Sequence, residues 1–350
     1  MRLAARTTGQ SAAVAFTAVA LAVSMGAATP AAADPIADFY KGRQISMLIA
    51  HEVATGYDIY ARLLARHLGR HIPGNPTFVP QNMLGASGIN GANVLFNVSA
   101  KDGSVIGTFA HTVPLDPLIG QGAAKFDSSK FNYIGNMEES VGVCAVWAEA
   151  GINNLNDLIA KETRFGATAT TGPPSQMAAA VKNLLGGKVR LVHGYKGAPG
   201  VKIAIEKGEV QGICGMPMST LRSQWSDVLD TGKIKPFIQL SGAKGALPGV
   251  EYVYDRAKSD EDRQVYDLIF GILKLGKIFA APPGVPADRV KALRAAFDAT
   301  MADKEFLAEA TKIRIDISPA TGDQVAAFIV GIYRSSPEVV ARARKAVVYE

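Results

Sequence analysis

Short apolar runs alternate with amphipathic stretches along the chain, beginning at residues 45–50. That first run is almost entirely apolar and is followed by a polar loop, which is typical of a strand covered on both faces of a parallel sheet. In the next stretch Arg62 and Arg66 share one helical face, while Leu63 and Leu64 fall on the opposite side. The pattern therefore predicts a strand, a loop and a surface helix in succession.

The predicted helix has a defined start. Thr55 and Asp58 fit the capping box, in which a Thr hydroxyl and an acid three residues later each accept a backbone N–H of the first turn. A helix that begins at the carboxyl end of a strand offers free N–H groups and the positive end of its dipole, which suits a carboxylate or phosphate. We take this as a candidate ligand site; an ordinary strand-to-helix connection is the alternative interpretation.

The same unit recurs along the chain. Ser175 is expected to cap a helix over residues 176–185. Further strands are expected at residues 76–80, 105–110, 141–146, 164–168, 190–193, 210–215, 236–240 and 276–281. Alternating strands and helices indicate mainly parallel sheets whose connecting loops gather at the carboxyl edge.

These elements predict an α/β protein with two domains, each a mainly parallel sheet flanked by helices. The strand at 276–281 and the helices after it are interpreted as a return of the chain to the first sheet. Domain 1 is therefore expected to comprise residues 34–140 plus 274–350, and domain 2 residues 141–273.

Residues 1–33 have the composition of an export signal peptide. Arg2 and Arg6 precede an apolar run rich in Ala and Val, and Ala33 ends a small-residue cleavage site before Asp34. No later apolar run approaches the ~20 residues of a membrane span, so a soluble, periplasmic protein is expected. Removing the two arginines lowers the formal charge from +6 to +4. This mild excess, without a Lys/Arg run, argues against nucleic acid and modestly favours anionic ligands.

The chain has two cysteines, Cys144 and Cys214, both in predicted strands of the second series. In an oxidising compartment they can form a disulfide, which the chain-entropy model values at about 4 kcal/mol for a loop of this length. Two buried thiols are the alternative, and we favour the disulfide.

The histidines invite a metal interpretation and a catalytic one. His67 and His71 have the spacing of two zinc ligands, but no Glu follows His67 and no third ligand is near, so both are expected to pack. His51 and His111 each follow a predicted strand, and with Asp58 and Ser87 they suggest a hydrolytic site, although Asp58 is already assigned to the helix cap. No Gly-x-Ser-x-Gly motif is present, so we expect the two histidines to hydrogen-bond a ligand and no residue to be catalytic.

Small residues dominate the predicted loops, at residues 54–56, 86–88 and 169–172, whereas phosphate-loop and dinucleotide motifs are absent. Such residues let backbone N–H groups approach a ligand closely, so recognition through the backbone is expected, without a cofactor or a metal. Tyr195 and Lys196 add an aromatic side chain and a positive charge at a fourth loop. A solvated surface turn is the alternative interpretation of that pair.

Several long segments in order resemble the solute-binding proteins of tripartite tricarboxylate transporters, also called the Bug family. They are residues 38–50, 56–76, 81–107 and 193–212, followed by Ala-Pro-Pro-Gly-Val-Pro at 281–286. The resemblance covers essentially all of the chain after residue 33. It implies a periplasmic binding protein of the second structural type, which closes on a small carboxylate between its domains.

The resemblance also implies which residues hold the ligand, largely through backbone N–H groups and bridging waters. Carried over by motif, the ligand-binding residues are Ala54, Thr55, Gly56, Tyr57, Asp58, Ala86, Ser87, Gly88, His111, Thr112, Ala169, Thr170, Thr171 and Tyr195. The first loop departs from the family pattern, because Glu52, Val53 and Ala54 stand where a Pro- and Gly-rich loop is usual. Pro173 and Pro174 also make the loop after residue 169 stiffer than the glycine-rich family version, which leaves room for a different or bulkier solute.

We therefore expect an exported, non-enzymatic binding protein for a small organic anion of the di- or tricarboxylate class. It is expected to be a monomer that delivers the ligand to membrane transporter subunits. Two alternatives remain: an exported hydrolase or lyase that uses His51 or His111 in the same cleft, and a purely sensory partner of a membrane receptor.

Overall fold

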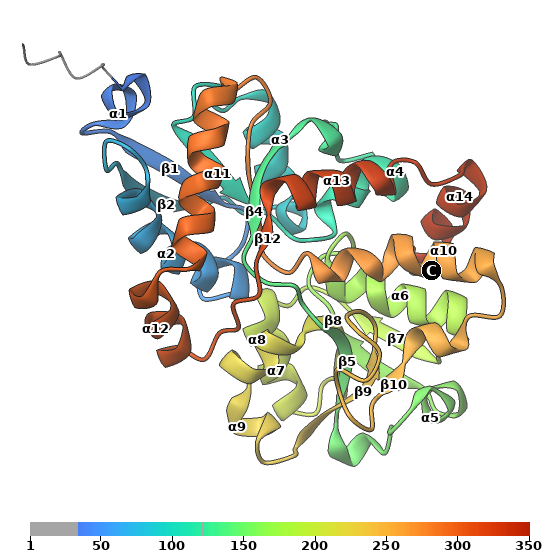
Figure 1. Ribbon diagram of the computed structural model, residues 1–350. Helices are drawn as coiled ribbons and strands as arrows, with labels where there is room; N and C mark the ends of the chain where they lie inside the picture. The colour runs from blue at the N-terminus through green and yellow to red at the C-terminus, as the bar shows by residue number, and fades with distance from the viewer. Residues whose placement is uncertain (1–33, 121) are drawn as a thin grey trace, which may run out of the picture. The chain divides into compact units, whose positions relative to one another are not determined.

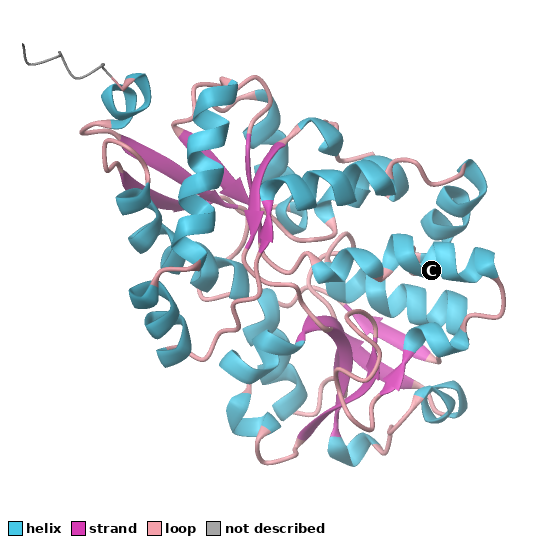
Figure 2. Cartoon of the chain, in the orientation of Figure 1, coloured by secondary structure: helices cyan, strands magenta, loops and turns pink. Residues whose placement is uncertain are grey.

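The computed structural model describes residues 34–120 and 122–350, and the predicted signal peptide at 1–33 lies outside these ranges. The strands gather in two groups, coloured magenta in Figure 2. The first sheet has the order β12-β4-β11-β3-β1-β2 and the second the order β10-β9-β5-β8-β6-β7. We call each sheet, with the helices that pack on it, a lobe.

The strands of the first sheet are β1 (Gln44–Ile49), β2 (Thr77–Asn82), β3 (Val105–Thr108), β4 (Asn132–Asn136), β11 (Ile278–Ala281) and β12 (Ala320–Thr321). Those of the second sheet are β5 (Gly142–Trp147), β6 (Thr163–Gly166), β7 (Val189–Val192), β8 (Gly212–Pro217), β9 (Ile234–Gln239) and β10 (Glu251–Tyr252). The first sheet thus draws on both ends of the chain and the second on its middle (Figure 1).

The helices before residue 230 are α1 (Pro35–Tyr40), α2 (Gly56–His67), α3 (Ile89–Asn97), α4 (Asp116–Ile119), α5 (Leu155–Ala160), α6 (Pro173–Leu185), α7 (Gly197–Glu206), α8 (Met218–Gln224) and α9 (Ser226–Leu229). Those after it are α10 (Asp260–Ile269), α11 (Ala287–Met301), α12 (Lys304–Lys312), α13 (Gly322–Ile332) and α14 (Pro337–Ala346). The last of them, α14, packs on α4 of the first lobe and on α6 of the second.

In each sheet, the strand by which the chain enters from the other lobe runs antiparallel to both of its neighbours. β5, the first strand after the first crossing, is antiparallel to both β8 and β9. β11, the first strand after the return crossing, is antiparallel to both β3 and β4. The remaining long strands run parallel, β1 with β2 and β3, and β6 with β7 and β8. The predicted α/β class is confirmed; both sheets are mixed, because of these entering strands and, in the first sheet, because β12 is antiparallel to β4.

Alternation along β1 explains how the first sheet is covered. Ile45, Met47 and Ile49 belong to a buried cluster with residues of α2, α11 and α12, whereas Leu48 belongs to a cluster with α3 and α13. Successive strand side chains point to opposite faces, so an almost fully apolar strand needs helices on both sides. The carboxyl edge of the sheet stays uncovered by these helices, and the loops of the site lie there.

Two predictions about elements were wrong. β4 was not expected, because its sequence Asn-Tyr-Ile-Gly-Asn is polar at both ends and contains no apolar run. Ser175 was expected to cap a helix over residues 176–185, but that helix, α6, begins at Pro173 and has Gly172 as its N-cap. The hydroxyl of Ser175 lies 2.9 Å from Nε2 of His193 instead. Proline is favoured in the first helical turn, where its missing N–H costs nothing, so the two prolines start the helix earlier.

Within residues 34–120 and 122–350, no helix is long and apolar enough to cross a membrane. The structure joins Cys144 of β5 to Cys214 of β8 by a disulfide between neighbouring strands of the second sheet.

Candidate functional site

A cavity of about 310 Å³ lies where loops of the two lobes meet. From the first lobe it is lined by residues that follow β1, β2 and β3, together with Lys277 just before β11. From the second lobe it is lined by residues that follow β6, β7 and β8. Loops at the carboxyl ends of parallel strands are the usual ligand-binding position in open α/β sheets, as predicted from the alternating pattern.

The first loop is shaped by the start of α2. The Thr55 hydroxyl accepts the N–H of Asp58 at 3.4 Å and donates to the carbonyl of Glu52 at 2.8 Å. The predicted cap at Thr55 is thus confirmed, but the Asp58 carboxylate accepts the N–H of Ala54, at 3.0 Å, rather than that of the N-cap. Ala54 has a positive φ of 64°, which turns the loop sharply into the helix. The first N–H groups of α2 have no acceptor within the helix and lie at the cavity.

Asp58 supports the loop and does not line the cavity. It is 3% exposed, and its carboxylate also accepts from Nε of Arg62 and Nδ2 of Asn82, each at 2.9 Å. Asn82 in turn donates to the carbonyl of His51 at 2.9 Å. These bonds tie the loop to the end of β2, and they occupy the carboxylate that a hydrolytic site would need beside a histidine.

Tyr57, His51 and His111 form an aromatic cluster in the cavity wall. The rings of His51 and Tyr57 stack with their centroids 4.0 Å apart, and Oη of Tyr57 lies 2.8 Å from Nδ1 of His111. The same oxygen accepts the backbone N–H of His111 at 3.3 Å, so its own proton is free to be donated to Nδ1. This arrangement places the imidazole proton of His111 on Nε2.

Both histidines are neutral at neutral pH. Burial, and next the charge of Lys277, lower the pKa of His51 to about 3, and the same two causes do so for His111. Nε2 of each ring is buried and has no hydrogen-bond partner among the described residues. On His111 this atom carries the ring proton, and a buried N–H that has lost its water gains from a ligand oxygen. With a conjugate acid of such low pKa, either ring is a poor general base.

Lys277 is the buried cation of the cavity, and the sequence did not single it out. Its side chain is 1% exposed, and Nζ lies 3.1 Å from Oε2 of Glu138, which is 3% exposed. Nζ also lies 4.7 Å from the ring centroid of Tyr60 and 5.2 Å from that of Tyr57, where ring faces add cation–π attraction. The charge of Lys277 is therefore matched within the protein.

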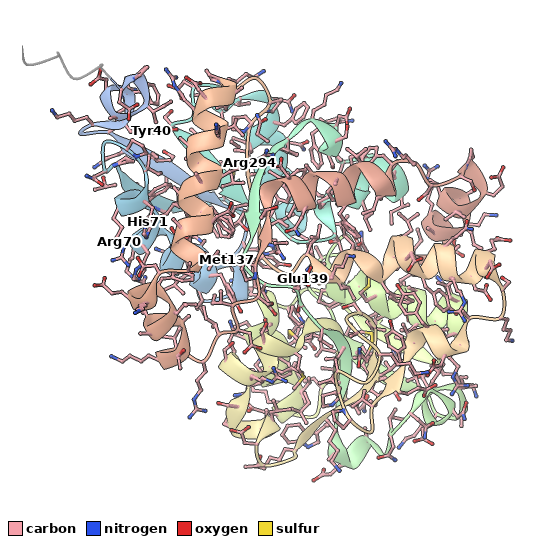
Figure 3. All side chains as sticks on the ribbon, in the orientation of Figure 1. Tyr40, Arg70, His71, Met137, Glu139 and Arg294 are labelled. Atoms are coloured by element: carbon pink, nitrogen blue, oxygen red, sulfur yellow. A yellow bond between two sulfur atoms is a disulfide. The ribbon has the colours of Figure 1, made fainter. Side chains whose placement is uncertain are left out.

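The ion pair of Lys277 and Glu138 belongs to the two crossings between the lobes. In Figure 3 the labelled Met137 and Glu139, which flank Glu138, lie between the two sheets. The N–H of Met137 donates to the carbonyl of Lys277 at 3.0 Å, and the N–H of Gly276 donates to the carbonyl of Glu138 at 3.0 Å. The crossing segments 137–141 and 274–277 thus run side by side, with the ion pair joining them at the cavity.

The second loop approaches the cavity with left-handed backbone. Ala86 and Ser87 have φ of 46° and 51°, and Gly88 has φ of 100° and serves as the N-cap of α3. A Cβ at Gly88 would lie 3.2 Å from the carbonyl oxygen of Ala50, so a glycine lets this loop pack against the end of β1. The loop is thereby held against the first one.

Close approaches across the cavity show that the two lobes are in contact there. A Cβ at Gly197 would lie 3.0 Å from Cγ2 of Thr55. One at Gly172 would lie 2.7 Å from Oγ of Ser87, and one at Gly56 would lie 3.1 Å from Oγ1 of Thr220. Glycine at these positions lets the backbones of both lobes come close around the cavity.

The second lobe supplies mainly apolar surface. Pro173 and Pro174 at the start of α6 line the cavity, as do Ile213 and Met216 of β8. Tyr195 lines it as well, with its hydroxyl donating to Glu209 at 3.2 Å, whereas the neighbouring Lys196 is exposed. The prolines make this wall rigid and leave few polar groups to face a ligand.

The structure brings most of the predicted ligand-binding residues to one cavity. Those lining it are Thr55, Gly56, Tyr57, Ala86, Ser87, Gly88, His111, Ala169 and Tyr195. Ala54, Asp58, Thr112, Thr170 and Thr171 belong to the same loops but are not part of the lining. The lining residues that the prediction missed include Thr168, Pro173, Met216, Thr220 and Lys277. Met216 lies at the end of β8 and Thr220 in the first turn of α8. They were missed because the sequence has no small-residue loop motif between these two elements.

His67 and His71 lie away from the cavity in an ionic cluster of the first lobe. His67 Nε2 lies 2.6 Å from Glu309 Oε2, and His71 Nε2 lies 2.8 Å from Asp303 Oδ2. Arg70, labelled beside His71 in Figure 3, pairs with Asp303 and Glu305. Among the described residues, no three His, Cys, Asp or Glu side chains gather as a metal site would require.

Solved structures with the same fold are solute-binding proteins. A TctC solute-binding protein from Polaromonas, solved without ligand, is 19% identical with a TM-score of 0.60, over 88% of this chain and 99% of that one. The periplasmic binding protein BugD is 18% identical with a TM-score of 0.67, over 89% and 100%. MatC from Rhodopseudomonas palustris, solved with bound malate, is 15% identical with a TM-score of 0.66, over 87% and 99%. The chain thus has the two-domain fold of periplasmic binding proteins, as its resemblance to that family implied.

A comparison with protein-family models and one with curated protein sequences found no match.

Proposed function

We propose that this chain is an exported solute-binding protein that captures a small organic carboxylate between its lobes. The observation that carries the proposal is the pair of buried, unpartnered Nε2 atoms of His51 and His111 beside the N-terminus of α2. The neutral N–H of His111 and the free N–H groups of the helix, held in one cavity, suit a carboxylate. The relatives with this fold are binding proteins, and one was solved with malate.

In this proposal the ligand contacts follow from the cavity. The N–H groups of Gly56 and Tyr57 and Nε2 of His111 donate to the carboxylate from the first lobe. The remaining predicted residues that line the cavity, Thr55, Ala86, Ser87, Gly88, Ala169 and Tyr195, enclose the rest of the ligand. Asp58 serves indirectly, because it holds the loop that presents these donors.

We propose that the two lobes are domains that move about the paired crossing segments. Domain 1 comprises residues 34–140 plus 274–350, and domain 2 residues 141–273. Hinged closure of this kind is common when a ligand lies between two domains, and few residues absorb the motion. The segments 137–141 and 274–277 are short and hydrogen-bonded to each other, which supports this position for the hinge.

The protein is proposed to act in the periplasm, after removal of residues 1–33, as a monomer that delivers its ligand to the membrane subunits of a tripartite tricarboxylate-type transporter. Delivery to a sensory receptor is the alternative within the same class. Genes for membrane subunits beside that of this chain would favour transport.

Titration calorimetry with a panel of small carboxylates tests the function. We expect stoichiometric binding of at least one carboxylate, loss of binding by the matching uncharged amide, and recovery of the ligand chemically unchanged by NMR. Binding of no carboxylate, or equal binding of acid and amide, would contradict carboxylate capture. Conversion of the ligand would instead favour an enzyme using His51 or His111.

A further inference from the structure

We infer that the cavity selects a carboxylate with a single negative charge and an uncharged, apolar body. This inference rests on the proposed function and narrows the di- or tricarboxylate class that the sequence favours. Three features of the described lining residues carry it: the charge of Lys277 is already matched, Glu52 contributes a negative charge, and the opposite wall is apolar.

The charge of the cavity leaves little compensation for a second carboxylate. Among the lining residues that the structure describes, the ones with formal charge are Glu52, Lys196 and Lys277, since His51 and His111 are neutral. Lys277 is held by Glu138 at 3.1 Å with both side chains buried. A ligand carboxylate beside Lys277 would share this cation with Glu138, so the three groups together would carry a net negative charge.

The single charge of a monocarboxylate has a place in the first lobe. The N-terminus of α2 carries about half a positive charge, and Nε2 of His51 and of His111 lack partners. These groups come from residues that follow the neighbouring strands β1 and β3, and their residues all line the cavity. A charge-assisted hydrogen bond is stronger than one between neutral groups, which makes this end of the cavity the site of the anionic head.

The body of the ligand then faces a largely apolar wall. Pro173, Pro174, Ile213 and Met216 line the second-lobe side, and Leu84 lines the first-lobe side at 56% exposure. Apolar surface of this kind gains from an aliphatic chain or an aromatic ring and does not solvate a charge. Lys196 is exposed at the rim, where an ion pair contributes little because water screens it.

Glu52 opposes a second negative charge directly. It lies in the first loop, is half-buried, and lines the cavity beside His51. In a cavity of about 310 Å³ the head carboxylate beside His51 lies near Glu52, and a dicarboxylate adds a second negative charge to the same space. Like charges in a partly desolvated site repel strongly, so a dianion is expected to bind more weakly than the monoanion of the same length.

A series of three six-carbon probes tests the inference at neutral pH by calorimetry: hexanoate, adipate and 6-aminohexanoate. We expect hexanoate to bind at least ten times more tightly than adipate, and more tightly than 6-aminohexanoate. Benzoate and terephthalate form a second pair with the same expected order. Adipate at least as tight as hexanoate would overturn the single-charge claim, and 6-aminohexanoate tighter than hexanoate would show that Glu52 receives a cation.

The variant Glu52→Gln tests whether the charge of Glu52 causes the weaker binding of adipate. It is expected to raise the affinity for both acids, and that for adipate at least threefold more than that for hexanoate, because adipate carries the second charge. Glu149→Gln removes the same charge at an exposed position outside the cavity and is expected to change neither. Tight adipate binding by the unaltered protein would refute the inference but uphold carboxylate capture. If no carboxylate of either series or of the wider panel binds, the proposed function fails together with it.

Discussion

Nζ of Lys277 lies 3.1 Å from Oε2 of Glu138, and the two residues belong to the two segments that cross between the lobes. Their side chains are 1% and 3% exposed, so the ion pair is almost completely shielded from water. Because Lys277 also lines the cavity, the pair connects the ligand site to the proposed hinge. A ligand that disturbed Lys277 would disturb the contact between the crossing segments.

Removing one member of this pair is expected to cost more than removing both. Lys277→Met leaves the Glu138 carboxylate buried without its cation and should lower the free energy of unfolding by about 3–5 kcal/mol. Combining it with Glu138→Leu replaces the pair by apolar side chains of similar volume and should recover most of that loss. Urea unfolding of the ligand-free proteins measures both values. A double variant at least as unstable as Lys277→Met would show that the ion pair is not what the single substitution disrupts.

Sequence reasoning identified loops that line the cavity but missed the buried Lys277. The run at residues 45–50 and the cap at Thr55 were predicted because both depend on neighbouring residues. Lys277 was missed because a lysine before a strand is normally solvated, and its partner Glu138 is 139 positions away in the sequence. β4 was missed for a similar reason, since its burial comes from β11 and β12 rather than from its own composition.

The predicted ligand-binding residues of one loop are only partly at the cavity. The prediction included all of residues 169–171, although a loop turns only some of its residues toward a cavity. Ala169 lines the cavity, whereas Thr170 and Thr171 are not part of the lining. Pro173 and Pro174, expected in this loop, form the first turn of α6 instead. This side of the cavity is therefore formed by the N-terminus of a helix.

Filling the cavity from the first loop is expected to abolish binding without unfolding the protein. A Cβ at Gly56 would lie 3.1 Å from Oγ1 of Thr220 and 3.5 Å from Cε of Lys277, so Gly56→Leu places its side chain in the ligand space. We expect the ligand-induced rise in Tm to disappear while the circular dichroism spectrum is unchanged. Gly331→Leu is the matched control, because it lies in α13 with open space around it and should bind normally. A Gly56→Leu protein with the affinity of the unaltered chain would exclude this loop from the site.

The disulfide is expected to stabilise the second lobe. Cys144 and Cys214 close a loop with a sequence separation of 70, which the chain-entropy model values at about 4 kcal/mol. Replacing both residues by Ala should lower the free energy of unfolding by about 2–4 kcal/mol, with ligand affinity retained because neither residue lines the cavity. The mass of the intact protein without reductant should be that of a chain lacking two hydrogens. Alkylation of both thiols in the unfolded, unreduced protein would contradict the bond.

His111 is expected to contribute to the pH dependence of the free energy of unfolding. Burial lowers its pKa from 6.5 to about 3, so between these values the unfolded chain takes up a proton that the folded one does not. This residue therefore leaves stability unaffected above pH 6.5 and lowers it as the pH falls, by about 1.4 kcal/mol per pH unit, until the folded ring also protonates. His111→Asn removes the titrating ring and retains an acceptor for Tyr57. Urea unfolding from pH 7 to pH 4.5 should show the unaltered protein losing stability more steeply than the variant, and parallel curves would mean that His111 titrates normally in the folded state.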